Sequence, residues 1–299
     1  MKFMRYTKFW FGLSALLIVP GLIGLATWGL KVGIDFKGGT LIELRFTGGD
    51  TSQPAEGIRT ALADSNLENL IVQSAGQGSV FLRTGTIDQE KRTEIENKIK
   101  NAVGEFEEVR FESVGPTISQ DLTRKAIIAV IVASLVIILY IAFAFRGVPK
   151  PASSWRFGVS AVGALLHDLI FVIGAFAILG HFFHYEIDSL FITALLTVMG
   201  FSVHDTIVVF DRLRENLRKS PALAFSDIAD ISISQTLGRS LATSLTVIFV
   251  LLSLFLLGGE STRPFVLALL LGVTIGTYSS IFNATPLLVV WQNRATRHR

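Results

Sequence analysis

The sequence has 299 residues, of which 50% are hydrophobic and 17% charged, and its mean hydropathy of +0.53 is too high for an ordinary soluble protein. The net charge is only +3, and the basic residues form short clusters beside apolar runs, which argues against a nucleic-acid-binding surface. Because the chain has no cysteine, disulfides and thiolate metal sites are excluded.

The first apolar run, at 9–30, follows basic residues and resembles a signal peptide in its charges. It is longer than the apolar region of a signal peptide and no small-residue cleavage site follows it, so we interpret it as a retained transmembrane helix. A bilayer requires roughly 20 apolar residues per helix. The stretches that qualify are 9–30, 125–145, 157–180, 188–210, 238–257 and 264–291.

The segment 31–122 has the composition of a water-soluble domain. Alternation in "GTLIELRFT" predicts a half-buried strand, "LIVQSAGQGSVFLRT" predicts two strands around a Gly-rich turn, and "FEEVRFESV" predicts a last strand. Helices are expected between them, the second with Thr86 and Gln89 as a capping box. The order β-α-β-β-α-β predicts a ferredoxin-like α+β fold. The segment contains no cluster of His and carboxylates and no Ser/His/Asp set. We therefore expect it to be a binding or docking domain, and we expect the chain not to be an enzyme.

Gly38 and Gly39 interrupt the start of the first strand of this domain, in "DFKGGT". Backbone freedom or close approach of another segment is the usual reason for glycine at such a position. We therefore expect a structural turn there.

The chain is thus expected to be a multi-pass α-helical membrane protein with six transmembrane helices and one ferredoxin-like extracytoplasmic domain. Its regions would be 1–30 with the first span, 31–122 outside the membrane, and 123–299 with the other five spans and the C-terminal tail. We expect Thr117 and Gln120 to cap the second span, and 220–237 to form a separate interfacial helix. The small-xxx-small pair Gly272 and Gly276 predicts close helix packing in the last span.

Lysine and arginine are concentrated in alternate loops, which predicts the orientation of the spans. They are frequent in the N-terminus, in the loops 146–156 and 211–238, and in the C-terminal tail. The loop "HFFHYEID" has none, and "GGESTR" has only Arg263. We therefore expect both termini in the cytoplasm and the protein in the cytoplasmic (inner) membrane.

Several ionisable residues fall inside the predicted spans: His167 and Asp168 in the third, His204 and Asp205 in the fourth, and Arg239 at the start of the fifth. An Asp near the bilayer centre costs roughly 2.5–3.5 kcal/mol, and an Arg at the same depth would lower the cost of both charges. Asp205 and Arg239 could form a static ion pair. Alternatively Asp205 is a proton carrier, because burial favours the neutral acid and a nearby cation favours the carboxylate.

The pair His167–Asp168 is interpreted first as a source of interhelical hydrogen bonds and second as another relay point. His181, His184 and Glu186 have the spacing of metal ligands but no supporting ligand set, so we expect no metal and no cofactor. Intramembrane aspartyl proteases carry a Gly-x-Gly-Asp motif, which the segment 202–205 lacks.

Six segments in order carry a resemblance to a known family: "VGIDFKGGT", "VGPTIS", "LLHDL", "GFSVHDTIVVFDRLREN", "SISQTLGRSLATSLT" and "GTYSSIF". Together they resemble SecF, the smaller membrane subunit of SecDF protein-export complexes in the RND superfamily. The resemblance implies a proton relay at Asp205 and Arg239. The candidate supporting residues are His167, Asp168, Ser202, His204 and Thr206.

The resemblance also implies partners: a SecD chain, the SecYEG channel, YajC and preprotein substrates, with the proton-motive force promoting late steps of translocation. One departure is His204, where SecF proteins often have Asn, and its titration could shift the pH range of Asp205. RND-type transporters use two six-helix halves, so one half should be incomplete alone, with its proton path along the seam with a second chain. The alternative function is an RND-like half-transporter for a lipid or small molecule, which would need a deep apolar pocket in the outer domain.

Overall fold

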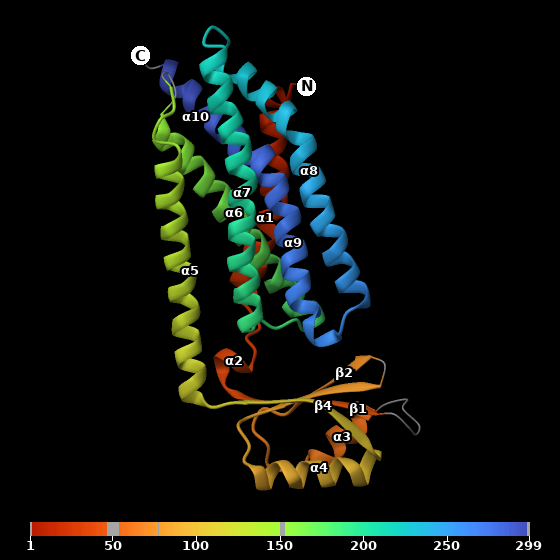
Figure 1. Cartoon of the computed structure of the whole chain (residues 1–299). Helices are drawn as coiled ribbons and strands as arrows, with labels where there is room; N and C mark the ends of the chain where they lie inside the picture. The colour runs from red at the N-terminus through yellow and green to blue at the C-terminus, as the bar shows by residue number, and fades with distance from the viewer. Residues whose placement is uncertain (1, 47–53, 77, 150–152, 298–299) are drawn as a thin grey trace. The chain divides into compact units, whose positions relative to one another are not determined.

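The computed structural model of the chain describes residues 2–46, 54–76, 78–149 and 153–297 (Figure 1). Parts of the basic loop and of the tail used to predict the orientation, 150–152 and 298–299, lie outside the described residues. The chain separates into two compact units, Val32–Ile127 and the remainder, Met1–Lys31 with Ile128–Arg299.

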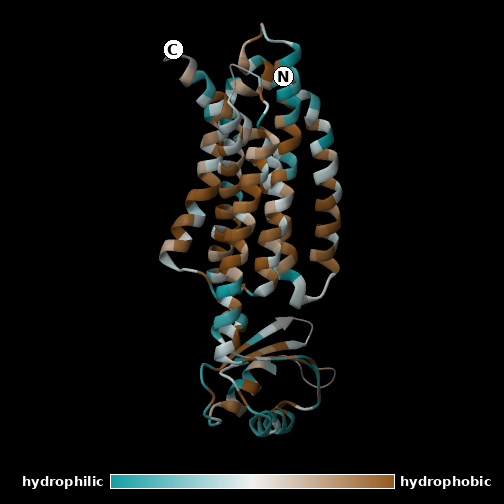
Figure 2. Ribbon diagram, turned by 60° about the vertical axis from the view of Figure 1, so that its left-hand side comes forward, coloured by the Kyte–Doolittle hydropathy of each residue, from teal (hydrophilic) through white to brown (hydrophobic). Residues whose placement is uncertain are grey.

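Six helices in the described residues are long and apolar enough to cross a membrane, as expected. Figure 2 shows hydrophobic residues along the helices and hydrophilic residues toward their ends. The helices are α1 (Thr7–Thr27, after a 3-10 turn at Phe3–Tyr6), α5 (Pro116–Ala144), α6 (Ser154–Phe183), α7 (Ser189–Lys219), α8 (Phe225–Leu257) and α9 (Arg263–Ser279), the last continuing through a π-helical turn, η3 (Ser280–Ala284), into α10 (Thr285–Arg297). A 3-10 turn, η2 (Glu260–Thr262), precedes α9.

Three local expectations were wrong. No separate helix forms at 220–237, because α8 begins at Phe225 and continues into the span without a break. Helix α5 begins at Pro116, whose missing N–H is tolerated in a first turn, so Thr117 lies inside the helix. Helix α4 (Gln89–Val103) is capped by Asp88, whose Oδ1 accepts a hydrogen bond from the Lys91 backbone N–H at 2.8 Å, and not by Thr86.

The helices α6, α7 and α9 form the centre of the membrane unit. Between 44% and 56% of the residues in their spans are buried, against 6% in α5. Ile141 near the end of α5 and Phe145 just after it are buried against the bundle. The ring of Phe145 meets Phe157 of α6 and Phe210 of α7. A glycine pair brings α1 and α6 together, because a Cβ on Gly21 of α1 would lie 2.9 Å from the Gly174 Cα of α6.

The expected close packing at Gly272 and Gly276 is confirmed. A Cβ on Gly272 would overlap the side chain of Val198 on α7, and one on Gly276 would lie 3.2 Å from the Ser202 Cβ. Glycine at these two positions therefore lets α9 and α7 pack closely.

The second unit is a four-stranded antiparallel sheet of order β2-β3-β1-β4. The strands are β1 (Gly39–Phe46), β2 (Ile71–Gly76), β3 (Ser79–Thr84) and β4 (Phe106–Val114), with α2 (Ile34–Lys37) before them and α3 (Pro54–Leu62) and α4 as the crossover helices. In Figure 1, α3 and α4 lie on the same side of the sheet. The element order and strand order are those of the expected ferredoxin-like fold.

The domain core comes from alternate residues of the central strands and from the inner faces of the two helices. Ile42 and Leu44 of β1 lie opposite Leu82 and Val80 of β3, and all are at most 1% exposed. Ile58 and Leu62 of α3 and Ile95 and Ile99 of α4 cover them. Truncating one such residue to Ala typically costs about 2–5 kcal/mol.

Gly38 and Gly39 both have positive φ angles, +79° and +128°. A Cβ on Gly39 would lie 2.7 Å from the Thr84 carbonyl oxygen of β3. Backbone conformation and close approach therefore both require glycine at position 39.

We predict that Gly39→Val destabilises the outer domain by more than the roughly 1–3 kcal/mol of a strained backbone, because the side chain also collides with Thr84. Gly104→Val is the matched control, since Gly104 has a φ of +102° but nothing within 4 Å of its Cβ position. Limited proteolysis of the membrane-embedded protein measures the difference. Equal protease resistance of the two variants would contradict the prediction.

Candidate functional site

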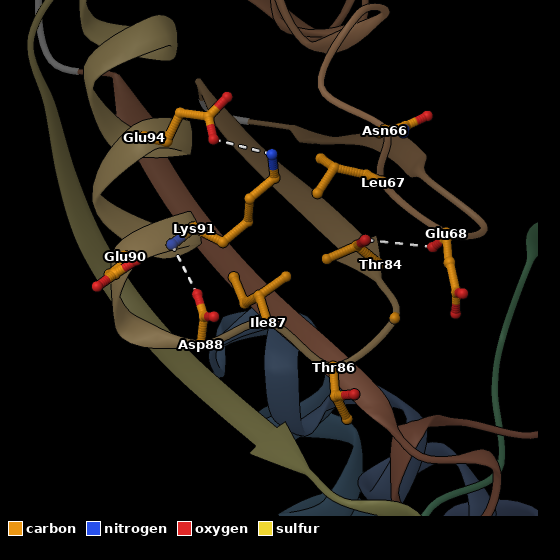
Figure 3. Close-up of a pocket in the computed structure, with 11 residues that line it drawn as sticks. Asn66, Leu67, Glu68, Thr84, Thr86, Ile87, Asp88, Glu90, Lys91 and Glu94 are labelled. Carbon is orange, nitrogen blue, oxygen red and sulfur yellow. Dashed lines mark hydrogen bonds and ion pairs between the residues drawn. The ribbon is translucent and has the colours of Figure 1, made fainter.

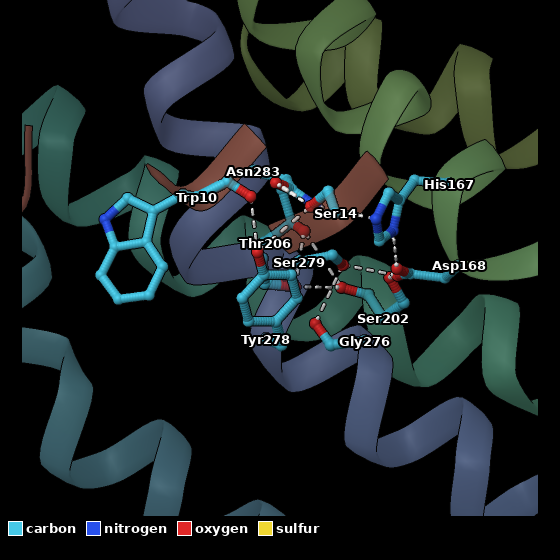
Figure 4. A network of polar contacts seen from close by, with 11 residues as sticks. Trp10, Ser14, His167, Asp168, Ser202, Thr206, Gly276, Tyr278, Ser279 and Asn283 are labelled. Atoms are coloured by element: carbon cyan, nitrogen blue, oxygen red, sulfur yellow. Dashed lines mark hydrogen bonds and ion pairs between the residues drawn. The ribbon is translucent and has the colours of Figure 1, made fainter. Parts of the chain in front are cut away.

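Asp168 lies at the meeting point of α6, α7 and α9 (Figure 4). Its side chain is 0% exposed, and its Oδ2 accepts hydrogen bonds from Ser202 Oγ at 2.5 Å and Ser279 Oγ at 2.7 Å. Its Oδ1 lies 2.9 Å from His167 Nδ1. Asp168 thus makes the interhelical hydrogen bonds that were the favoured interpretation of this pair.

The network continues from His167 toward α1. His167 Nε2 lies 3.0 Å from Asn283 Nδ2, and Asn283 Oδ1 accepts from Ser14 Oγ at 2.7 Å. If Nδ1 of His167 donates to Asp168, its Nε2 accepts from Asn283, and every polar atom along this line has a partner. Ser14 also meets the Tyr278 hydroxyl at 3.1 Å, which donates to the Trp10 carbonyl at 2.8 Å.

The π-helical turn at Ser280–Ala284 directs polar residues of the last span toward three different helices. Ser279 faces α6 through Asp168, and Asn283 faces α1 and α6. Ser280 faces α7, where its Oγ lies 2.9 Å from Thr206 Oγ1 and donates to the Ser202 carbonyl at 3.1 Å. Such turns occur frequently at functional sites.

Asp205 belongs to a second, separate polar cluster. It is 2% exposed, and among the described residues its Oδ2 accepts one hydrogen bond, from Ser244 Oγ of α8 at 3.3 Å. Thr277 Oγ1 of α9 donates to Ser244 Oγ at 2.7 Å. The His204 Nδ1 lies 3.7 Å from Asp205 Oδ1, but 67% of its side chain is exposed.

Arg239 does not join this cluster. It lies on the exposed face of α8, and no ion pair joins it to Asp205 within the ranges that the structure describes. Of the candidate supporting residues, His167 and Ser202 bond to Asp168, Thr206 bonds to Ser280, and His204 lies beside Asp205.

Sequence reasoning missed two direct partners of the aspartates, Ser279 and Ser244. It also missed the groups that bond next in each network, namely Ser14, Thr277 and Asn283. A signal for two of them was present. Ser279 lies one turn after Gly276, the residue at which α9 packs closely against α7. Ser244 belongs to a series of hydroxyl residues that recur every fourth position.

A pocket of about 450 Å³ in the outer domain is lined mainly by charged and polar side chains (Figure 3). Lys91 Nζ pairs with Glu94 at 2.8 Å, and hydrogen bonds from Lys91 and Lys98 lower the pKa of the Glu94 carboxyl to about 2. This lining differs from the deep apolar pocket that a small-molecule porter would need.

In the described part of the chain, no three His, Asp or Glu residues could hold a metal ion. His181 instead stacks on Trp28, and His184 contacts Lys31.

Comparison with known sequences places these features in one family. Residues 94–294 match the C-terminal region of the protein export membrane proteins SecD/SecF, and residues 23–49, which include Gly38 and Gly39, match the SecD/SecF GG motif. A protein translocase subunit SecF from Thermobaculum terrenum is 46% identical, over 97% of this chain and 94% of its own. The SecF of Anaerolinea thermophila is 42% identical, over 96% and 93%.

The fold agrees with a solved structure. The crystal structure of SecDF, a translocon-associated membrane protein from Thermus thermophilus, matches 98% of this chain with a TM-score of 0.86 at 33% identity. This chain spans 39% of that SecDF chain. Family profile, full-length relatives and fold agree, and the chain belongs to the SecF family of protein-export membrane proteins.

Proposed function

We propose that this chain is an accessory subunit of the Sec preprotein translocase and, with a SecD chain, uses the proton-motive force to promote late steps of translocation. The observation that carries the proposal is Asp205, a carboxyl group buried at membrane depth. In the part of the chain that the structure describes, it has one long hydrogen bond and no ion pair to Arg239. Such a group is costly in a membrane and is a functional site by default. A static ion pair with Arg239 would need a contact between the two side chains.

The proposed SecD partner is supported by what the isolated chain leaves exposed. Arg239 and most of the His204 side chain face outward at membrane depth, where a charge facing lipid is expensive. A second helical bundle would cover them, and the matched SecDF chain is long enough to hold one beside the part like this chain. The SecYEG channel, YajC and preproteins complete the proposed set of partners, with an export role that needs no enzyme chemistry in this chain.

The proposed location is the cytoplasmic membrane, with both termini in the cytoplasm. We expect a reporter fused near Val80 to be outside and one near Phe225 to be inside, because lysine and arginine are concentrated in alternate loops. Alkaline phosphatase and green fluorescent protein fusions measure this. Two reporters on the same side would overturn the topology.

We predict that Asp205→Asn assembles normally with SecD but abolishes transport driven by the proton gradient, while the ATP-driven step at the channel survives. Asparagine keeps the size and hydrogen bonding of the protonated acid but does not ionise. Asp168→Asn is the matched control, because we propose that Asp168 ties helices together through Ser202 and Ser279. It should keep most of the transport, measured in vesicles with equal amounts of complex. Full activity of Asp205→Asn would refute the carrier role.

Arg239→Met should also stop gradient-driven transport. In the cycle that we propose, Arg239 comes within reach of Asp205 when the proton leaves, and its charge favours that release. The double variant Asp205→Asn with Arg239→Met separates carrier from architecture. If the two residues form a structural ion pair only in the assembled complex, its neutral replacement is often tolerated, and near-normal transport by the double variant would assign both residues to architecture. The carrier role predicts that it stays inactive in the same vesicle assay.

A further inference from the structure

Helix α8 carries a line of buried hydroxyl residues that ends at Asp205. Ser232, Thr236, Ser240 and Ser244 recur every fourth residue, and their exposures are 0%, 7%, 3% and 1%. A spacing of four keeps them on one face of the helix. Arg239 lies off this face, exposed beside Ser240.

The two ends of the line have different surroundings. At one end Ser244 Oγ donates to Asp205 Oδ2. At the other, Ser232 Oγ accepts from Asn216 Nδ2 of α7 at 2.9 Å, and the same nitrogen donates to Gln235 Oε1 at 2.9 Å. Gln235 is exposed and accepts from Arg212 Nε at 2.7 Å. The line therefore runs from the buried carboxyl to the solvent-facing, arginine-rich end of α7.

Ser240 is the exception within the line. Thr236 and Ser232 donate to backbone carbonyls one turn earlier, at 3.0 and 2.7 Å, as hydroxyls in helices usually do. The Ser240 hydroxyl is buried and has no hydrogen-bond partner among the described residues. Leaving a buried hydroxyl unpaired forfeits a hydrogen bond, so such groups are normally satisfied by protein or by an ordered water. Its place, one turn from Ser244, puts that water between Asp205 and the solvent-facing end.

We propose that Ser240 holds an internal water and that this water, with the hydroxyls of α8, is the route by which a proton passes between Asp205 and the arginine-rich end of the bundle. The inference rests on the proposed carrier role of Asp205. In the release direction, the Asp205 carboxylic acid gives its proton to the hydrogen-bonded line. The water passes a different proton onward to solvent, which leaves the Asp205 carboxylate and an unchanged line of hydroxyls.

Thiol accessibility tests the water site without relying on transport. Because the chain has no cysteine, Ser240→Cys creates a single thiol at nearly unchanged size. Ag⁺ is close to water in size and does not partition into apolar packing. In vesicles with the assembled complex, we expect Ag⁺ to block Ser240→Cys, detected as loss of alkylation after denaturation. Ala194→Cys on α7 is the control, because Ala194 is also 0% exposed but lies in the apolar core. Equal protection of the two thiols from Ag⁺ would overturn the proposal.

Proton flux through the same vesicles tests the route. Ser240→Ala should lower gradient-driven flux about fivefold, the size expected for one lost hydrogen bond. Ser240→Thr keeps the hydroxyl and should retain more flux, although threonine is larger. If Ser240 were only a small packing residue, alanine would be tolerated and threonine harmful, and that order would overturn the proposal. Ser234→Ala, at an exposed serine of α8, should change nothing.

The outcomes separate this inference from the function on which it rests. Loss of flux in Asp205→Asn with an Ag⁺-inaccessible Ser240→Cys refutes the water route alone. An accessible thiol with full transport by Asp205→Asn refutes the proposed function, and the proton role of the line with it. An accessible thiol, inactive Asp205→Asn and reduced flux in Ser240→Ala support both.

Discussion

The arrangement of the membrane bundle depends on the need to satisfy carboxyl groups that are buried among apolar helices. An Asp in this setting costs roughly 2.5–3.5 kcal/mol on insertion scales, so each requires donors from neighbouring helices. Asp168 receives them from Ser202 of α7, Ser279 of α9 and the adjacent His167. The three central helices α6, α7 and α9 are thus joined at one point, and the less buried helices pack around them.

Those hydrogen bonds are short because the helices approach closely. Gly276 lies against Ser202, and a Cβ there would also come within 3.6 Å of Asp168 Oδ2. A larger residue would push α9 away from α7 and lengthen the bond from Ser279 to Asp168. The glycine positions and the polar network therefore depend on each other. The small residues allow a short distance between the helices, and that distance lets the hydroxyl groups hydrogen-bond across it.

The sequence predicted those features that depend on composition and period. Apolar runs predicted six spans, and alternation in the outer segment predicted four strands and a ferredoxin-like fold. It failed where a choice between nearby groups decided the outcome, as when Asp88 and not Thr86 capped α4. Sequence position indicated the depth of Asp205 and Arg239 but not the rotation of their helices. Whether the two side chains touch therefore could not be predicted. In the structure Arg239 faces outward, while Ser240, the next residue, is buried. Hydroxyl partners such as Ser244 were missed because most helical Ser and Thr bond to their own backbone.

The two buried aspartates differ in a way that suits different roles. Asp168 accepts several short hydrogen bonds from residues on three helices, so a side chain without an acceptor oxygen at this position would disturb the packing of all three. Asp205 accepts one bond at 3.3 Å, from a serine that also has a partner in Thr277. Under the proposed carrier role, a proton would leave or join Asp205 while the contacts among α6, α7 and α9 at Asp168 persist. In the proposed function, Asp168 is the fixed anchor and Asp205 is the carboxyl that changes its protonation, with only about one turn of α7 between Ser202 and Asp205.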